Sequence, residues 1–378
     1  MIKTAYYQDL TKMNTFGMKV KARCFMEYDS VADLVDIEFE ELARPVLHIG
    51  GGSNLLFTDD FKGTILHSKI NFIEILDECQ CVPETPSHSV GPSPYPGVGK
   101  CLLHTNGTSS GTSKLLVSVG AGVVFDDFCD WAAKEGLWGV ENLSYIPGEV
   151  GASAVQNIGA YGVEVKDVIR NVYCYDTVEE EFVNFDVEDC EYGYRDSVFK
   201  NPEIKGRYIV THVVFALSRT PQPKLEYGNL KGVLEGHPEE SLTPVQIRKA
   251  IIKIRKEKLP EPSVKGSAGS FFKNPVISAE HFAKIEASAK AELGVDYKVP
   301  HYDLPDGTVK VPAAWMIEQC GWKGKRSGGA AVWDKQPLVI VNYTGEAYPE
   351  EIIGLEKRII ASVKSKYGID LHPEVEHV

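Results

Sequence analysis

Long hydrophobic runs are missing from this chain of 378 residues. No stretch approaches the roughly 18 consecutive apolar residues that a membrane-spanning helix requires. The first residues, MIKTAYYQDL, also lack the basic segment and apolar core of a secretory signal. We therefore expect a cytoplasmic protein that does not bind a membrane.

Cysteines are scattered, and the eight in the sequence form no framework of short spacings. Disulfide-stabilised secreted domains use dense, patterned cysteines, so we interpret these as reduced thiols. Three of them, together with two histidines, fall in or beside residues 77–113. Their spacing does not give the closed tetrahedral set that zinc takes, and we expect no metal. The residues concerned are Cys79, Cys81, His88, Cys101 and His104.

Positive charge is in deficit, because 40 Lys and Arg face 53 Asp and Glu, for a formal net charge of −13. A surface of this sign repels a phosphate backbone, so we expect no nucleic-acid partner. Backbone amides and a few local cations can still hold a single phosphate ligand. The hydrophobic fraction of 43% supports packed cores, and the length predicts two or three domains.

Strand and helix signals alternate irregularly, which predicts an α+β fold. Strands are predicted at 44–49, 63–66, 72–76, 115–119, 171–175, 181–185 and 208–215. Helices are predicted over 123–134 with Gly136 at the end, over 243–258 with a capping box from Thr243 to Gln246, and after Ser278, Pro312 and Pro349. Residues 77–113, rich in Pro, Gly and Ser, are predicted to form an inserted loop.

Two glycine-rich segments carry the strongest functional signal. The first runs from Gly50 to Asn54, directly after a predicted strand, and the second runs from Ile146 to Gly162. Glycine lets the backbone approach a phosphate closely, so the two could hold a diphosphate from both sides. Taken alone, each is more often an ordinary tight turn. The first is neither a dinucleotide fingerprint, which fails at Leu55, nor a P-loop, because no Gly-Lys-Ser/Thr follows.

The two segments belong to an ordered set of motifs: HIGGGSNLLF, GAGVVFDDF, LSYIPGEVGASAVQNIGAYG, EYGYRDSVFK, LEYGNL, KLPEPSVKGSAGSFFKNP, AAWMIEQCGWKG and HPEVEHV. This ordered set resembles the UDP-N-acetylenolpyruvoylglucosamine reductases. The resemblance implies an α+β fold, with a two-part FAD-binding domain of vanillyl-alcohol oxidase type and a separate α+β substrate-binding domain. It implies FAD-binding subdomains over 1–69, joined by the tail 359–378, and over 70–260 with the insertion 77–113, and a substrate domain over 261–358.

The resemblance also implies non-covalent FAD as the cofactor and NADPH as the hydride donor. We interpret His48, beside the first glycine segment, as a strand histidine rather than a covalent flavin link. The residues that would bind the cofactor are Gly50, Gly51, Gly52, Ser53, Asn54, Gly122, Ile146, Pro147, Gly148, Gly151, Ala152, Gln156, Asn157, Gly159, Ala160 and Tyr161.

Three residues match the catalytic positions of that family. Arg195 would face the substrate carboxylate, for which a planar guanidinium is well suited. Ser270 would donate a proton to the carbanion-like carbon, and Glu374 would act opposite Arg195 as a proton relay or protonated donor. Read alone, these are an ordinary surface arginine, a turn serine and a solvated carboxylate of the tail.

The implied substrate is UDP-N-acetylglucosamine enolpyruvate, bound by a monomer. The residues that would contact it are Tyr194, Tyr227, Lys258, Asn274 and Gln319. Three alternatives stay open. One is an FAD-dependent oxidase or dehydrogenase of another alcohol or hydroxy acid. Another is a serine acyl-transfer enzyme using the S-x-x-K pattern at Ser270, and the third is a non-catalytic sugar-nucleotide sensor.

Overall fold

The computed structural model describes residues 1–79 and 114–378, which form two compact units. The first unit comprises Met1–Gln8, Ala22–Gly51 and Lys62–Arg255, and the second comprises Asp9–Lys21, Gly52–Phe61 and Lys256–Val378. The predicted inserted loop, 77–113, lies outside the described residues except at its start, where strand β6 (Ile73–Cys79) continues. The three-part division expected from the sequence stays a prediction.

A four-stranded sheet in the first unit leads into the first glycine segment. Its strands follow the order β1 (Lys3–Asp9), β2 (Lys21–Tyr28), β5 (Phe61–Ser68) and β3 (Val46–Ile49). Strands β3 and β5 run parallel, with Val46 opposite Thr64. A Cβ on Gly63 would overlap the carbonyl oxygen of Pro45, so only glycine fits this close approach. Helix α1 (Val31–Val35) packs Leu34 on this sheet.

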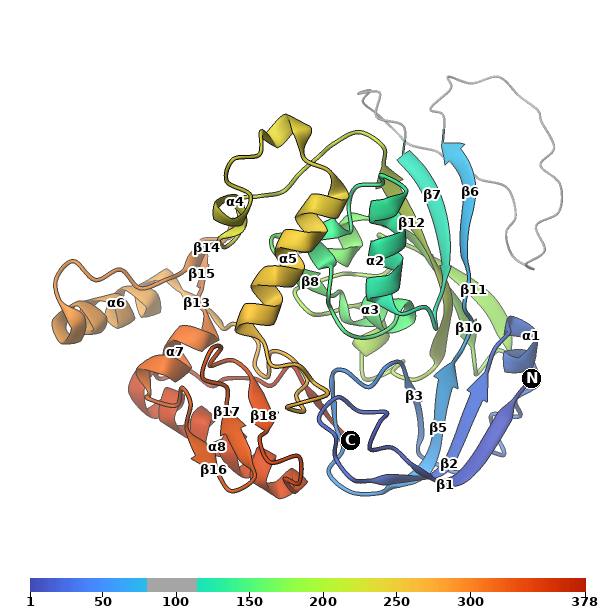
Figure 1. The fold of residues 1–378 in the computed structure, drawn as a ribbon. Coiled ribbons are helices and arrows are strands. Elements are labelled where there is room, and N and C mark those ends of the chain that lie inside the picture. The colour runs from blue at the N-terminus through green and yellow to red at the C-terminus, as the bar shows by residue number, and fades with distance from the viewer. Residues whose placement is uncertain (80–113) are drawn as a thin grey trace. The chain divides into compact units, whose positions relative to one another are not determined.

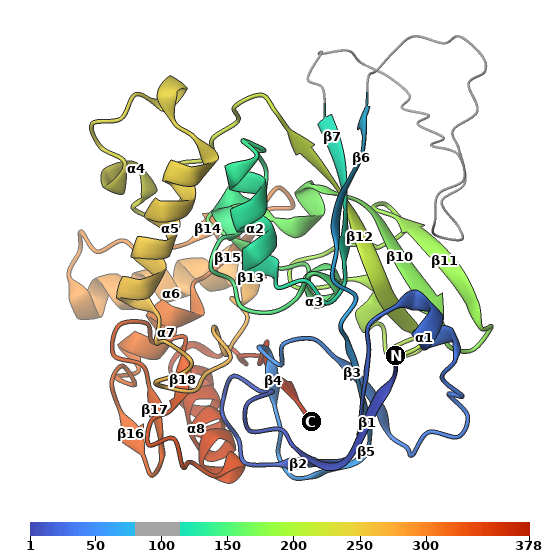
Figure 2. The same ribbon diagram turned by 45° about the vertical axis from the view of Figure 1, so that its right-hand side comes forward.

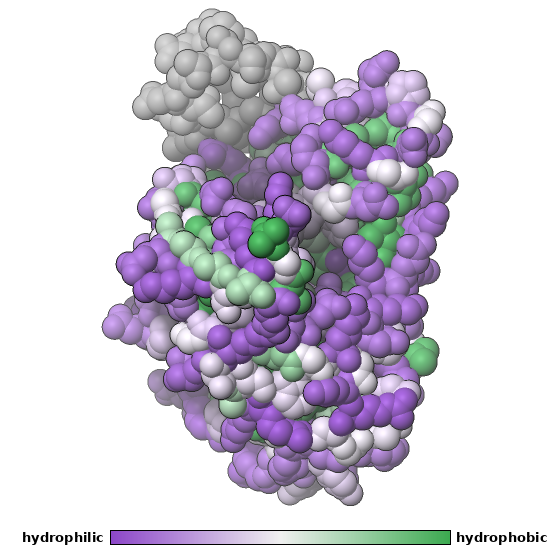
Figure 3. Space-filling model, turned by 90° about the vertical axis from the view of Figure 1, so that its left-hand side faces the viewer, coloured by the Kyte–Doolittle hydropathy of each residue, from purple (hydrophilic) through white to green (hydrophobic). Residues whose placement is uncertain are grey.

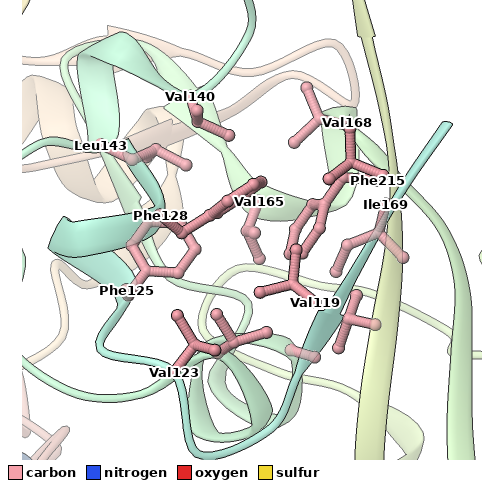
Figure 4. Packing of buried hydrophobic residues seen from close by; sticks show 14 of the residues in the cluster. Val119, Val123, Phe125, Phe128, Val140, Leu143, Val165, Val168, Ile169 and Phe215 are labelled. Carbon is pink, nitrogen blue, oxygen red and sulfur yellow. The ribbon is translucent and has the colours of Figure 1, made fainter. Parts of the chain in front are cut away.

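A five-stranded antiparallel sheet forms the larger core of the first unit. Its order is β11 (Glu181–Asp186), β10 (Ile169–Asp176), β12 (Tyr208–Ser218), β7 (Lys114–Gly120) and β6. Helices α2 (Phe125–Lys134) and α3 (Val150–Gln156) lie on one face of it (Figure 1, Figure 2). The ring centroids of Phe128 on α2 and Phe215 on β12 are 4.6 Å apart within the apolar core that Figure 4 shows.

Helices α4 (Leu230–Val233) and α5 (Pro244–Lys258) follow this sheet in the chain. The predicted capping box of α5 is confirmed, because Thr243 N donates to Gln246 Oε1 at 2.9 Å and Gln246 N donates to Thr243 Oγ1 at 3.3 Å. Arg248 ties α5 to α2 through ion pairs with Asp126 and Asp130. Single 3₁₀ turns lie at Glu141–Leu143, Val165–Asp167, Val198–Lys200 and Glu239–Ser241.

The second unit contains three small sheets and three helices among its described residues. The sheets are β13 (Val276–Ser278) with β15 (Thr308–Lys310) and β14 (Tyr302–Asp303), β16 (Arg326–Ser327) with β17 (Ala330–Val332) and β18 (Ile340–Asn342), and β4 (Leu55–Leu56) with β19 (Glu376–His377). The helices are α6 (Ala279–Leu293), α7 (Ala313–Gln319) and α8 (Pro349–Tyr367). The helix starts predicted after Ser278, at Pro312 and at Pro349 are confirmed, and Ser278 Oγ accepts from His281 N at 3.2 Å.

The C-terminal strand returns to the segment that follows the first glycine segment. Strand β19 runs parallel to β4, with Glu376 opposite Leu55. The last residue continues this pairing, because Thr58 N donates to Val378 O at 2.7 Å. The tail is therefore an ordered part of the second unit.

Polar side chains cover most of the face that Figure 3 shows, and apolar residues form small separate patches on it. Scattered exposed apolar residues of this kind are normal for a folded protein. Among residues 1–79 and 114–378, every helix is too short or too polar to cross a bilayer.

Candidate active site

Gly50 and Gly51, the part of the first glycine segment that belongs to the first unit, face the second glycine segment. A Cβ on Gly50 would lie 3.1 Å from the Ala152 Cβ, and a Cβ on Gly51 would lie 3.5 Å from the Gly148 Cα. Glycine at these positions therefore brings backbone, rather than side chains, to the place where the segments meet. The structure thus brings together two segments that lie about a hundred residues apart in the sequence.

The second glycine segment is not a continuous loop, although its composition is typical of one. It contains the short helix α3, which starts at Val150. Gly151 lies inside this helix, where its N–H donates to Ala121 O at 3.0 Å and a Cβ would lie 2.9 Å from the Ala121 Cβ. Gly122 is similar, because its N–H donates to Ile70 O at 2.9 Å. These two glycines allow close packing beneath the segment.

Backbone strain is concentrated around this segment. Seven non-glycine residues of the described chain have positive φ angles. Four of them flank the candidate site: Tyr145 at 63°, Asn157 at 44°, Tyr161 at 49° and Arg195 at 55°. Asn157 takes this conformation as the C-cap of α3, a use that asparagine tolerates well. For tyrosine and arginine it is unfavourable and persists where the surroundings hold it in place, which is common at functional sites.

Arg195 is held against the end of the second glycine segment. Its Nη2 donates to Gly159 O at 2.6 Å, and its Nη1 donates to Asn157 O at 3.3 Å. Asn157 is fully buried, and its Nδ2 donates to Gly193 O at 2.7 Å. Lys200 Nζ bridges Gln156 Oε1 and Arg195 O, both at 3.0 Å. Four predicted site residues, Gln156, Asn157, Gly159 and Arg195, are therefore neighbours.

Strands β8 (Gly159–Ala160) and β9 (Val163–Glu164) form a short hairpin that presents Tyr161. The rings of Tyr161 and Tyr227 meet edge to face, with centroids 6.3 Å apart. Tyr227 is 43% exposed, so its ring remains accessible. The guanidinium of Arg195 lies 5.4 Å from the ring centroid of Tyr194. Both predicted substrate tyrosines of the first unit thus lie beside predicted cofactor or catalytic residues.

Asn142 and Arg255 support this region, and sequence reasoning assigns a role to neither. Asn142 is fully buried, and its Nδ2 donates to Tyr161 O at 3.0 Å and to Lys224 O at 2.8 Å. Arg255 Nε donates to Tyr145 O at 3.1 Å, and burial lowers the pKa of its guanidinium. The signal that could identify Arg255 is the apolar face of α5, which continues into this charged residue near the helix end.

In the second unit, the tail pairs with the segment that contains Ser270. Glu374 N donates to Phe271 O at 2.8 Å, and Phe272 forms a β-bridge with Pro373. Phe271 and Phe272 are buried, while Ser270 is exposed. Two buried rings therefore anchor the segment that carries the exposed Ser270. The paired backbone brings Glu374 close to this segment.

The first glycine segment also reaches this pair. Asn54 Nδ2 donates to Glu374 O at 3.1 Å, within the second unit. This bond explains why a residue four positions from the C-terminus has a fixed backbone. The alternative of a solvated, free carboxylate at the chain end does not describe Glu374, whose residue is half-buried.

The remaining predicted substrate residues lie in the second unit. Asn274 Oδ1 accepts from Ala313 N at 2.9 Å and so caps the start of α7, while Gln319 is the last residue of that helix. Lys258 is exposed at the end of α5, where its carbonyl accepts from Trp333 Nε1 at 3.0 Å. The roles assigned to these three side chains stay predictions.

His48 lies on β3, as the sequence interpretation required. Tyr28 Oη lies 2.6 Å from His48 Nε2, and burial lowers the pKa of His48 to about 3. The cysteines and histidines of the insertion lie outside the described residues, apart from the backbone of Cys79. Within the described ranges, no group of three or more His, Cys, Asp or Glu is arranged to hold a metal ion.

Comparison with known proteins covers nearly the whole chain. Residues 261–378 match the C-terminal domain of UDP-N-acetylenolpyruvoylglucosamine reductase, and residues 88–181 match an FAD-binding domain. A UDP-N-acetylenolpyruvoylglucosamine reductase from Bacteroides fragilis is 46% identical over 370 residues, covering 98% of each chain. One from Porphyromonas gingivalis is 42% identical, covering 98% of this chain and 97% of its own.

A solved structure of the same kind of reductase from Thermus caldophilus has the same fold, with a TM-score of 0.60. It is 21% identical and covers 100% of this chain and 98% of its own. The predicted fold class, an α+β FAD-binding fold with a separate C-terminal domain, is confirmed. The chain therefore belongs to the UDP-N-acetylenolpyruvoylglucosamine reductase family and is an FAD-binding oxidoreductase.

Proposed function

We propose that the chain catalyses the NADPH-dependent reduction of UDP-N-acetylglucosamine enolpyruvate to UDP-N-acetylmuramate, in peptidoglycan precursor synthesis. Relatives named as this reductase match it from end to end at 46% and 42% identity. The structural observation that carries the proposal is the pairing of the tail with the Ser270 segment, since it gives the near-terminal Glu374 a fixed place.

The residues present fit FAD as the cofactor. At the meeting point of the two glycine segments, Cβ atoms on Gly50 and Gly51 would come within 3.1 and 3.5 Å of the opposite segment. Backbone amides brought close in this way bind a diphosphate without interposed side chains. We assign the cofactor's diphosphate to these segments. Bound FAD would supply the redox chemistry, taking a hydride from NADPH and passing it to the enolpyruvyl group.

Arg195 would bind the carboxylate of the enolpyruvyl group. Two of its N–H groups are committed to Asn157 O and Gly159 O, which fixes the plane of the guanidinium. The guanidinium keeps its positive charge at any physiological pH. A cation held in this way stabilises negative charge that develops on the carboxylate during reduction. The left-handed backbone of Arg195 is the strain that this placement entails.

Ser270 would deliver the proton to carbon. A hydroxyl is a weak acid, and it serves as a donor only when it is held in place and the carbon is strongly basic. Gly269, with φ of +70°, turns the backbone immediately before it, and Phe271 and Phe272 anchor the segment after it. Glu374 would act with Ser270, either by relaying its proton or by holding the substrate carboxylate as a protonated donor.

Five further residues would hold the substrate's nucleotide. Tyr227, packed on Tyr161, would cover the diphosphate, and Tyr194 would line the site beside Arg195. Lys258 would supply a point charge for the diphosphate, and Asn274 and Gln319 would contact the remaining nucleotide. We further propose that NADPH and the UDP-sugar bind in turn to a monomer.

Steady-state oxidation of NADPH tests this function. Consumption of NADPH should depend on UDP-N-acetylglucosamine enolpyruvate and should stop when that substrate is exhausted. UDP-N-acetylglucosamine, which lacks the enolpyruvyl group, is the matched control and should support no turnover. Purified protein without flavin, or equal turnover with both sugar nucleotides, would contradict the proposal. Turnover with an alcohol or hydroxy acid instead would favour the oxidase alternative.

A further inference from the structure

A buried histidine connects the second glycine segment to the sheet beneath it. His67 on β5 has Nε2 3.0 Å from Glu149 Oε1 and Nδ1 3.1 Å from Glu27 Oε1. The histidine is 4% exposed and Glu149 is 7% exposed. All three residues belong to the first unit, and we call them the Glu27–His67–Glu149 chain. The sequence motifs predict a role for none of them.

Both ring nitrogens of His67 face carboxylate oxygens. An ionised carboxylate only accepts hydrogen bonds, and a neutral imidazole has a single N–H to donate. Carboxylate oxygens lie within 3.1 Å of both ring nitrogens of His67, so two protons are needed for two hydrogen bonds. A hydrogen bond to each of two ionised carboxylates takes a proton on each ring nitrogen, and a ring with both protons carries one positive charge.

Neighbouring groups do not replace His67 in this role. Lys69 Nζ lies 3.8 Å from Glu27 Oε1, at the end of the Glu27–His67–Glu149 chain that is away from Glu149. Burial, and then the charge of His67, lowers the pKa of His48 to about 3, so His48 is neutral at pH 7. In the part of the chain that the structure describes, no lysine or arginine forms an ion pair with Glu149.

The carboxylate of Glu149 lies directly behind the two glycine segments. Glu149 follows Gly148 in the second segment, and a Cβ on Gly50 of the first would lie 3.3 Å from Glu149 Oε2. A diphosphate held by these segments is itself an anion. An unneutralised, buried carboxylate at this position would repel it across a medium of low dielectric.

We propose that His67 is a positioning residue of the cofactor site, whose proton neutralises Glu149 and so lets the two glycine segments accept a nucleotide diphosphate. The inference rests on the proposed placement of the FAD diphosphate at these segments. His67 touches neither the flavin nor the substrate in this arrangement. It acts through Glu149. Its effect on cofactor binding should depend on the charge at position 149, whereas the effect of a packing residue should not.

A double-mutant cycle on FAD binding tests the inference. Apo-protein of wild type, His67→Gln, Glu149→Gln and the double variant is titrated with FAD, and binding is followed by quenching of flavin fluorescence. We expect His67→Gln to weaken binding about tenfold, because glutamine brings no charge and can donate to only one of the two carboxylates. Glu149→Gln should bind at least as well as wild type, and the double variant should recover wild-type affinity.

The recovery is the decisive outcome. If His67 only filled space, the double variant would bind FAD no better than His67→Gln, and that result would overturn the inference. If His67→Gln does not fold, Glu149→Gln alone decides, because a weaker affinity than wild type contradicts charge repulsion. His212→Gln is the matched control, since His212 is another buried histidine of the first unit. Its ring stacks on that of Tyr173, with centroids 4.2 Å apart. It should keep wild-type affinity.

The failure of this inference can be told apart from the failure of the proposed function. Wild-type protein that binds no FAD would contradict the cofactor placement itself. Wild-type protein that binds FAD tightly, with a double variant that is not restored, would remove only the role of His67.

Discussion

At the scale of single residues, Ser270 has the most specific role in the proposed reaction. Its substitution by alanine would remove the proposed proton donor and leave the flavin and its reduction by NADPH intact. We expect Ser270→Ala to reduce the flavin at the wild-type rate, while reoxidation by the enolpyruvyl substrate slows by at least about a hundredfold. Stopped-flow absorbance separates the two half-reactions.

A second serine provides the control for this measurement. Ser362 lies on α8, where its Oγ donates to Arg358 O at 2.8 Å. Ser362→Ala should leave both half-reactions unchanged. Equal slowing of reduction and reoxidation in Ser270→Ala would show that the hydroxyl is not the proton donor.

The half-buried His48 and the buried His212 predict how stability depends on pH. Burial lowers the pKa of His48 to about 3 and that of His212 to about 4. Both would titrate near the ordinary value of about 6.5 when unfolded. The unfolded chain therefore binds more protons below pH ~6.5, so stability that is fully present above that pH falls as the solution becomes more acidic.

Thermal unfolding between pH 7 and pH 5 tests this sign. The melting temperature of wild type should fall over that range, and His48→Gln or His212→Gln should each make the fall shallower. The exposed His237 provides the control, and His237→Gln should keep the wild-type slope. If neither His48→Gln nor His212→Gln changes the dependence of melting temperature on pH, protonation of these side chains does not affect stability.

At the scale of elements, the segments with a local signal are predictable. The capping box at Thr243, the cap at Ser278 and the prolines at 312 and 349 place the helix starts correctly, because a helix start is decided within a few residues. Helix α3 is not predicted, because Gly151 resembles a loop glycine in the sequence. It is a packing glycine set against Ala121, and a contact across thirty positions leaves no local signal.

A glycine with backbone packed closely against it and a helix glycine with open space around it should respond oppositely to substitution by alanine. A Cβ on Gly63 would overlap Pro45 O, where β5 runs beside the start of β3. Gly354 lies inside α8 with nothing within 4 Å of such a Cβ. We expect Gly63→Ala to destabilise the first unit by several kcal/mol, whereas Gly354→Ala should stabilise its helix by about 0.5–1 kcal/mol.

Chemical denaturation of the two variants measures both effects. Each free energy of unfolding is compared with that of wild type under the same conditions. Similar small changes in both variants would mean that the approach of β5 to Pro45 does not require glycine.

At the scale of the whole molecule, the family and the order of its motifs are predictable from the sequence, while long-range contacts determine what surrounds them. Arg195 and the glycine segments are identified from motifs. The Glu27–His67–Glu149 chain is not, because its members are 40 and 82 positions apart and carry no shared pattern. Asn142 escapes prediction for the same reason, since its partners Tyr161 and Lys224 follow 19 and 82 positions later.

The central proposal is that Arg195, Ser270 and Glu374 act on one substrate molecule. The most direct measurement is a crystal structure of the FAD-bound protein with UDP-N-acetylglucosamine enolpyruvate, in a Ser270→Ala variant that cannot turn it over. We predict that the Arg195 guanidinium, the Glu374 carboxyl and the Cβ retained at position 270 all border the enolpyruvyl group beside the flavin ring. A complex in which any of the three faces away from that group would contradict the claim.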